Sequence, residues 1–141
     1  MAPAQKGQEK ADPSLALEQK KQLRPDQRIR KQEAFKNLVE KGNFTRGEFF
    51  YLWTGRQEEI GQEAYRARPM LGMIVGRSHD ARATSRNILK RRIREIFRKY
   101  QDELKKGTAF LVKAKQTRKK PSFKAIREDL EKLFKKAGEQ L

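Results

Sequence analysis

The feature that most constrains this chain is a segment with two opposed helical faces, over residues 86–104. Apolar side chains recur there at the spacing of a buried helical stripe: Leu89, Ile93, Ile96, Phe97, Tyr100 and Leu104. At about 100° per residue, basic side chains fall together on a separate arc: Lys90, Arg91, Arg94 and Arg98. We therefore expect a helix that packs by one face and presents a basic face to an anionic partner.

A basic arc on a helix has an ordinary explanation as well, because most charged faces are solvated and stabilised slightly by ion pairs four residues apart. Two observations favour a binding role. The arc has almost no acidic partners, since Glu95 lies to its side, and the whole chain carries a formal net charge of +17 at pH 7. Nucleic acids present dense phosphates, and release of their condensed counterions favours binding to such a surface.

The positive charge is concentrated in the second part of the chain. Residues 1–60 carry 12 basic and 9 acidic side chains, whereas residues 61–141 carry 23 and 9. Such asymmetry indicates a nucleic acid or an anionic membrane as partner. No apolar run approaches the length of a membrane span, and the amphipathic segments are of the core-packing type, so we expect no membrane partner.

Several kinds of site are excluded or disfavoured. The chain has no cysteine, which excludes disulfides, thiolate catalysis and cysteine-based zinc sites. The only histidine, His79, lies in a polar segment beside Asp80 and is expected to be solvated. We expect no catalytic residue and no metal site on this chain. The first residues lack the apolar stretch of a secretory signal and include Glu9 and Asp12, so we expect a cytoplasmic location.

The chain divides into an extension and one domain. Residues 1–22 are polar and are expected to be disordered, whereas residues 23–141 are expected to form a single RNA-binding domain. Helices are expected over 30–41 with Gly42 as C-cap, from an N-cap at Thr84 or Ser85 to about 105, and from a cap at Ser122 onward. Strands are expected over 48–54, 70–75 and 109–114, with a polar loop over 55–68.

This order of elements predicts an α+β fold, in which helices cover a three- to four-stranded sheet. The strand, basic helix and strand in the second half form a candidate parallel crossover, which general rules make right-handed. Alternation in the first strand places Phe50 and Leu52 on one face and Tyr51 and Trp53 on the other. One face therefore packs on helices, and the other is covered or serves as a binding platform.

The basic helix also carries a recognisable motif, Ala83-Thr84-Ser85-Arg86-Asn87-Ile88-Leu89-Lys90-Arg91-Arg92-Ile93-Arg94. In this motif the chain resembles the protein subunit of bacterial ribonuclease P, whose pattern is Ala-x-x-Arg-Asn-Arg-x-Lys-Arg-x-x-Arg. Further similarity lies in Arg28-Ile29-Arg30-Lys31, Phe50-Tyr51-Leu52-Trp53 and Phe110-Leu111-Val112-Lys113-Ala114-Lys115. The resemblance covers roughly residues 24–138. Ile88 departs from the pattern, because it stands where the family usually has its second arginine.

The resemblance implies an α-β-β-β-α-β-α fold, similar to the second domain of ribosomal protein S5, with a left-handed crossover. It also implies a ribonucleoprotein enzyme that removes the 5′ leader of precursor tRNA by hydrolysing one phosphodiester bond. The RNA subunit would carry the chemistry and bind the magnesium. The expected partners are ribonuclease P RNA and precursor tRNA, with no obligate protein partner. The alternative function is a non-catalytic ribosomal or ribosome-assembly protein that binds RNA.

The resemblance assigns residues to two surfaces. The basic helix would bind the RNA subunit through Arg86, Asn87, Lys90, Arg91, Arg94 and Arg98. A cleft between the sheet and the first helix would hold the leader through Phe35, Trp53, Phe123, Arg77, Lys113 and Lys115. Stacking on aromatic rings beside basic groups is a common way to hold single-stranded RNA. Ordinary core packing would also explain the three aromatic residues, and helix capping would also explain Arg86.

Overall fold

The computed structural model describes residues 23–77, 80–116 and 120–140. The predicted disordered extension, residues 1–22, and His79 lie outside the described residues. The helices are α2 (Gln32–Lys41), α3 (Gln57–Ile60), α4 (Ala83–Tyr100) and α5 (Phe123–Gln140), and short 3-10 turns occur at Pro25–Gln27 and Tyr65–Ala67. The strands are β1 (Asn43–Arg46), β2 (Phe50–Arg56), β3 (Met70–Ile74) and β4 (Thr108–Ala114).

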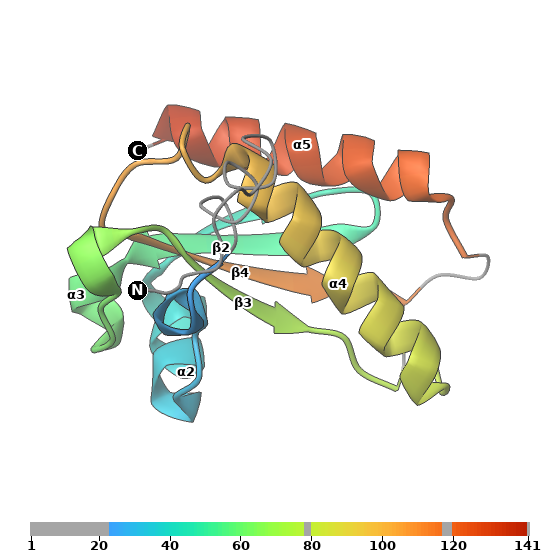
Figure 1. Ribbon diagram of the computed structural model, residues 1–141, viewed down its shortest axis with the longest axis horizontal. Helices are drawn as coiled ribbons and strands as arrows, with labels where there is room; N and C mark the ends of the chain where they lie inside the picture. Colours follow the sequence, from blue (N-terminus) through green and yellow to red (C-terminus); the bar gives the residue numbers. More distant parts are fainter. Residues whose placement is uncertain (1–22, 78–79, 117–119, 141) are drawn as a thin grey trace, which may run out of the picture.

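The strands form one four-stranded sheet in the order β1-β2-β4-β3. β2 pairs antiparallel with β1 and β4, whereas β3 and β4 are parallel, so α4 is the crossover between them. In Figure 1 both parallel strands run to the right, α4 returns in front of the sheet, and β4 lies above β3. The crossover is therefore left-handed, as the resemblance implies and against the general rule. The predicted α+β class is confirmed.

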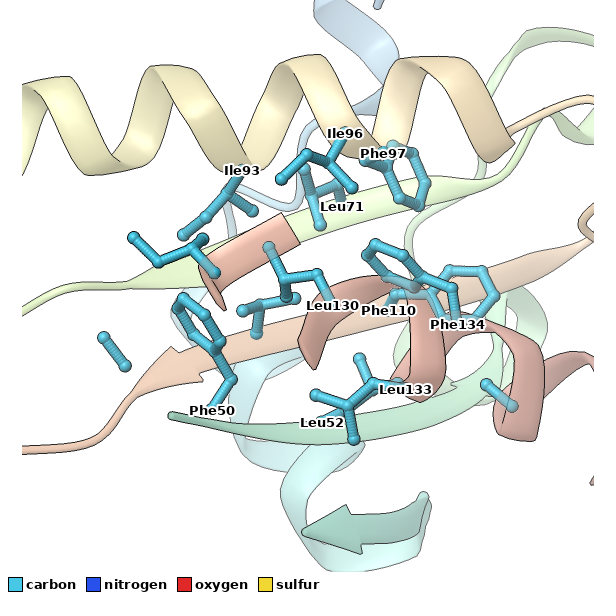
Figure 2. Packing of buried hydrophobic residues seen from close by; sticks show 14 of the residues in the cluster. Phe50, Leu52, Leu71, Ile93, Ile96, Phe97, Phe110, Leu130, Leu133 and Phe134 are labelled. Carbon is cyan, nitrogen blue, oxygen red and sulfur yellow. The ribbon is translucent and has the colours of Figure 1, made fainter. Parts of the chain in front are cut away.

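One face of the sheet packs against α4 and α5 and forms the first core. Figure 2 shows Ile93, Ile96 and Phe97 of α4 pointing toward the sheet and α5. The rings of Phe97, Phe110 and Phe134 meet edge to face, with centroids 5.6–6.0 Å apart. The apolar stripe predicted for the basic helix is buried here, which leaves the charged side of α4 facing outward.

The opposite face of the sheet packs against α2 and α3 and forms a second, smaller core. Ala34 and Leu38 of α2 lie over Leu111 at the centre of the sheet. The ring of Phe35 lies against Gly72 in β3, where a Cβ atom would come within 2.7 Å of the ring. Glycine at this position therefore allows the close approach of α2 to the strand.

Several boundaries differ from the sequence prediction. α4 begins at Ala83, with Arg82 rather than Thr84 or Ser85 as its N-cap, and it ends at Tyr100 rather than near residue 105. Tight turns follow, in which Glu103 and Leu104 donate backbone N–H groups to the carbonyls of Tyr100 and Gln101. The apolar periodicity predicted a helix that is too long at its C-terminus, because Leu104 fits the stripe. Leu104 is indeed buried, but it lies beyond the end of the helix.

The segment predicted as a polar loop, 55–68, is partly regular. β2 extends to Arg56 and is followed by α3. The side chain of Gln57 is buried and forms hydrogen bonds to three backbone groups. Its Nε2 donates to the carbonyls of Arg68 and Thr108, and its Oε1 accepts from the N–H of Ala64. The polar composition led to the prediction of a loop, although the segment is ordered. The buried glutamine forms hydrogen bonds with backbone N–H and C=O groups that a loop would expose to water.

The hairpin between β1 and β2 is held by a carboxylate from α5. Asp129 accepts the backbone N–H groups of Glu48 and Phe49 at 2.8 and 2.9 Å. A Cβ atom at Gly47 would lie 2.8 Å from both carboxylate oxygens, so only glycine fits there without displacement. These hydrogen bonds explain why β2 begins at Phe50 rather than at 48, and they fix the hairpin to α5.

Replacing Asp129 by Ala should lower the free energy of unfolding by about 1–3 kcal/mol, because two partly buried N–H groups lose their acceptor. Chemical denaturation followed by circular dichroism measures this loss. The neighbouring Glu128 is exposed, so Glu128→Ala should change stability by no more than about 0.5 kcal/mol. Equal effects of the two substitutions would contradict the role assigned to Asp129.

Candidate RNA-binding surfaces

The outward side of α4 carries the predicted basic arc. Asn87 and Arg91 are exposed, and Lys90, Arg94 and Arg98 are half-buried along the same helix. The side chains that the helix buries are all apolar: Leu89, Ile93, Ile96 and Phe97. The structure thus separates the two faces as the sequence predicts, and an anionic ligand can approach the basic side.

A cluster of arginines lies where α4 meets the segment before α2. Arg28, Arg91, Arg94 and Arg98, here called the arginine pocket, line a hollow of about 210 Å³ together with Leu23 and Glu95. Burial and the nearby charges of Arg28 and Arg91 lower the pKa of Arg94. Its guanidinium still remains charged at neutral pH. The pocket therefore concentrates like charges, and a phosphate group would relieve their repulsion.

Arg28 was not predicted as a site residue, although it belongs to a run that carries the resemblance. It is held beside β3 by a parallel bridge to Leu71 and by the N–H of Ile29, which donates to the Leu71 carbonyl at 3.0 Å. This pairing adds the segment to the sheet edge and brings Arg28 to α4. The basic run at 28–31 was the only available signal, and sequence spacing does not show that it reaches α4.

Arg86 has a different environment from the rest of the arc. Its Nη1 donates to the backbone carbonyls of Asp80 and Ala81, both at 2.9 Å. The guanidinium therefore fastens the connection before α4 to the first turn of the helix. This supports the capping interpretation of Arg86, and its binding to RNA stays a prediction.

Asp80 anchors the N-terminus of α4 to the segment before α5. Its carboxylate binds the ammonium of Lys120 at 2.6 Å and accepts the backbone N–H of Arg82 at 2.9 Å. The same ammonium donates to Ser85 Oγ at 3.0 Å. The hydrogen bonds from Lys120 and from the Arg82 N–H hold the pKa of Asp80 well below its usual value. This network of hydrogen bonds, rather than a serine or threonine cap, fixes the start of the helix.

Three aromatic side chains of the hairpin form a partly exposed surface on the face that carries α2. Phe44, Tyr51 and Trp53, here called the aromatic platform, have ring centroids 5.1–6.2 Å apart. The register explains the cluster, because Phe44 of β1 lies opposite Trp53 of β2. Phe44 remains 47% exposed, so it is available to a ligand. The sequence analysis missed Phe44 because β1 was not recognised between Gly42 and Gly47.

Basic groups surround the aromatic platform. The Arg46 guanidinium lies 5.8 Å and the Lys115 ammonium 4.8 Å from the centroid of the Tyr51 ring. Lys113 is exposed and lies opposite Tyr51 in the sheet. Arg77 is exposed and follows β3. Because β3 is parallel to β4, the C-terminal ends of both strands lie at the same end of the sheet. Rings beside cations have the composition of a single-strand RNA site.

The predicted leader aromatics do not lie together. Phe35 and Trp53 both pack against the second core on the α2 face, and both are partly buried. Phe123 lies at the start of α5, and the Arg92 guanidinium of α4 is 4.2 Å from its ring centroid. The prediction that these three residues share one cleft is therefore wrong for Phe123, which lies on the other side of the sheet. Helical spacing predicted that Phe123 belongs to the apolar stripe of α5. It did not predict which residues surround Phe123 in the folded protein.

Other kinds of site find no support among residues 23–77, 80–116 and 120–140. No group of three or more histidine, aspartate or glutamate side chains in these ranges is arranged to hold a metal ion. No helix in the same ranges is long and apolar enough to cross a membrane. The surfaces that stand out are the arginine pocket with α4, and the aromatic platform.

Known proteins are similar to this chain in sequence. The family model of Ribonuclease P matches residues 23–138. The chain is 29% identical over 110 residues to the ribonuclease P protein component of Pseudanabaena sp. (strain PCC 6903), covering 78% of this chain and 90% of that protein. With the component of Shouchella clausii (strain KSM-K16) it is 30% identical over 115 residues, covering 82% and 88%.

Solved structures are similar as well. The Staphylococcus aureus RNase P protein superimposes with a TM-score of 0.67 and 28% identity, covering 78% of this chain and 94% of that chain. The Thermotoga maritima RNase P protein gives a TM-score of 0.63 and 27% identity, covering 77% and 96%. Both the sequence and the fold of residues 23–138 are therefore those of one family.

Replacing Asp80 by Asn should lower the melting temperature at pH 7, because the ion pair with Lys120 is broken. Since the pKa of Asp80 is lowered by folding, its stabilising contribution is present above the unfolded value of about 3.9 and declines as the pH falls further. The difference between wild type and variant in thermal melts should therefore stay nearly constant from pH 7 to about pH 5 and shrink as the pH falls below about 4. The exposed Asp102→Asn is the control, and a difference that grows on acidification would contradict this assignment.

Proposed function

The chain belongs to the ribonuclease P protein family, and we propose that it binds the catalytic RNA through α4 and the 5′ leader of precursor tRNA through the aromatic platform. In this proposal the chain works in the cytoplasm as a subunit of an endoribonuclease. The RNA subunit hydrolyses the phosphodiester bond that joins the leader to the tRNA. The protein side chains bind and orient RNA and take no part in bond breaking.

The arginine pocket is the observation that carries RNA-subunit binding. Four guanidinium groups converge there on one hollow, and among the described residues Glu95 is the only carboxylate that lines it. Guanidinium forks match phosphate oxygens in a bidentate geometry that a lysine ammonium does not provide. Binding of a folded RNA would release counterions and also relieve the repulsion between Arg94 and its neighbours Arg28 and Arg91.

The aromatic platform supports leader binding. Phe44, Tyr51 and Trp53 offer ring faces on an open part of the sheet, and Arg46 and Lys115 stand beside Tyr51. Stacking on rings tolerates any base, because every base has a flat face. A leader of variable sequence could be held in this way, with Lys113 and Arg77 binding further phosphates.

The two surfaces lie on different sides of the sheet, which lets the protein hold two RNA segments at once. α4 packs on the face that carries Phe110 and Val112, whereas Trp53 packs on the face that carries Leu111. Arg28 is paired to the β3 edge of the sheet, whereas the aromatic platform lies on β1 and β2 at the opposite edge. The protein would thus position the leader relative to the RNA subunit from opposite faces of one rigid sheet.

Magnesium belongs to the RNA subunit in this proposal. Within the described residues the acidic side chains do not form a set of ligands that fits a magnesium ion. Asp80 and Asp129, which are ordered, are occupied by Lys120 and by backbone N–H groups. In this proposal, no step of the reaction uses a metal ion bound by this chain.

The basic face is tested by replacing Lys90, Arg91 and Arg94 together by Ala. Binding to the cognate ribonuclease P RNA should weaken, and the slope of log K against log salt should flatten by roughly one unit for each phosphate that the variant no longer binds. Filter binding or fluorescence anisotropy at several salt concentrations measures both quantities. RNA recovered with the wild-type protein should be ribonuclease P RNA, and recovery of ribosomal RNA would support the alternative function.

The matched control removes the same charge elsewhere. Lys132, Lys135 and Lys136 lie on α5, away from the arginine pocket, and their triple replacement by Ala should leave the slope nearly unchanged. If both triple variants flatten the slope equally, the binding is a non-specific effect of net charge. If neither does so, α4 is a solvated face.

The platform is tested by replacing Phe44, which is exposed and leaves the second core intact. Phe44→Ala should lose about 1–3 kcal/mol of binding to leader-bearing precursor tRNA, and much less for mature tRNA. Trp53 is the only tryptophan, so quenching of its fluorescence by a leader oligonucleotide gives an independent reading. Tyr65→Ala, at an exposed aromatic outside the platform, serves as control. A loss shared by mature tRNA would contradict leader recognition.

A further inference from the structure

A second aromatic site lies between α4 and α5, apart from both surfaces described above. The hollow there has a volume of about 220 Å³, and its walls include Ile88, Phe123, Arg92, Asp80, Lys120 and Ser85. This volume is below the range of about 300–1,000 Å³ that small-molecule sites usually have. It therefore suits a single planar group at the end of a larger ligand.

Two large apolar side chains remain open at this hollow. Ile88 is 44% and Phe123 38% exposed. Both stand on helices that bury neighbouring apolar residues: α4 buries Leu89, and α5 buries Ile126. Leaving such side chains exposed forgoes part of the stabilisation that full burial provides. Apolar groups that frame a hollow in this way indicate a surface that a ligand covers.

The ring of Phe123 is already flanked by planar cations. The Arg92 guanidinium lies 4.2 Å from the ring centroid, and that of Arg127 lies 5.9 Å from it. A planar guanidinium of the protein itself therefore packs on this ring in the absence of RNA. It also places positive charge at the mouth of the hollow, where a phosphate beside a stacked base would lie.

The remaining wall is polar and held in place. Lys120 binds Asp80 at 2.6 Å and Ser85 Oγ at 3.0 Å, so donors and acceptors are fixed next to the apolar residues. A nucleobase matches this composition, since it has apolar faces and a hydrogen-bonding edge. The charges favour RNA over an apolar protein segment, because Lys120 already neutralises the carboxylate of Asp80, and Arg92 adds a positive charge.

We propose that this hollow binds one unpaired base of ribonuclease P RNA, between Ile88 and Phe123, with Arg92 on the adjoining phosphate. The proposal rests on the proposed function, because it needs the RNA subunit to lie along α4. It also gives the isoleucine at position 88 a role: an aliphatic wall replaces the arginine that the family motif usually has there. The hollow is distinct from the aromatic platform, which lies across the sheet.

The first test measures affinity for ribonuclease P RNA in the absence of precursor tRNA. Phe123→Ala should bind about 5- to 150-fold more weakly, the loss expected for one stacked base. The salt slope should stay unchanged, because the substitution removes no phosphate-binding group. Phe123→Trp should retain affinity, whereas Phe123→Leu, which keeps apolar bulk but has no ring, should lose it. Tyr65→Ala, at an exposed aromatic residue outside both the platform and the hollow, should bind this RNA like wild type.

The affinity results separate the two proposals. Wild-type affinity of Phe123→Leu and Phe123→Ala would overturn the base site. Thermal melts identify a variant that fails to fold. If Phe123→Ala does not fold, the RNA affinity of Phe123→Leu tests the base site, because leucine keeps most of the packing volume. If the Lys90, Arg91 and Arg94 triple variant also binds normally, the proposed function fails with it.

The second test uses the absence of cysteine from the chain, which makes single-site labelling clean. Ile88→Cys carrying a benzophenone should crosslink to one unpaired nucleotide of the RNA. Glu95→Cys is the control, because Glu95 lies on the same helix and lines the arginine pocket. Crosslinking from position 95 but not from position 88, or only to paired nucleotides from position 88, would overturn the base site. Crosslinking from neither position would overturn RNA binding along α4.

Discussion

The packing of α4 on the sheet is the interaction on which the rest of the structure depends. Ile93 and Phe97 bury one side of the helix against Phe110 and Phe134, and this packing alone decides which side remains outside. Because 3.6 residues make one turn, fixing the apolar stripe also fixes the direction of every basic side chain on the helix. The direction of the basic face is thus a consequence of core packing.

The sheet is used unequally on its two faces, and this asymmetry creates the second surface. α4 and α5 cover one face, with Asp129 joining α5 to the hairpin, whereas α2 is short and covers only part of the other face. The hairpin end of that face stays open, so its aromatic side chains are only partly buried. A single framework therefore supports a guanidinium-rich edge and a ring-rich face, two chemistries that suit phosphates and unpaired bases respectively.

The free protein carries electrostatic strain that RNA would relieve. Burial, together with the nearby charges of Arg28 and Arg91, lowers the pKa of Arg94, in a chain whose net charge is +17. Self-repulsion of this kind weakens a compact state, and a bound polyanion removes it. The ordered carboxylates do not serve this purpose, since Asp80 and Asp129 hold loops in place. In the proposed complex, binding of RNA at the arginine pocket would therefore also stabilise the fold.

Local patterns in the sequence determined the stripe of α4, the alternation of Phe50 and Trp53 in β2, and the motif from Ala83 to Arg94. Each depends on neighbours within about one or two turns or a few strand positions, which periodicity reports directly. Only the tertiary structure brought Arg28 to Arg94, Phe44 to Trp53 and Phe123 to Arg92. These pairs depend on strand pairing, register and helix docking, which act between residues far apart in the chain. Periodicity gives the face on which a side chain lies, and packing decides what it meets there.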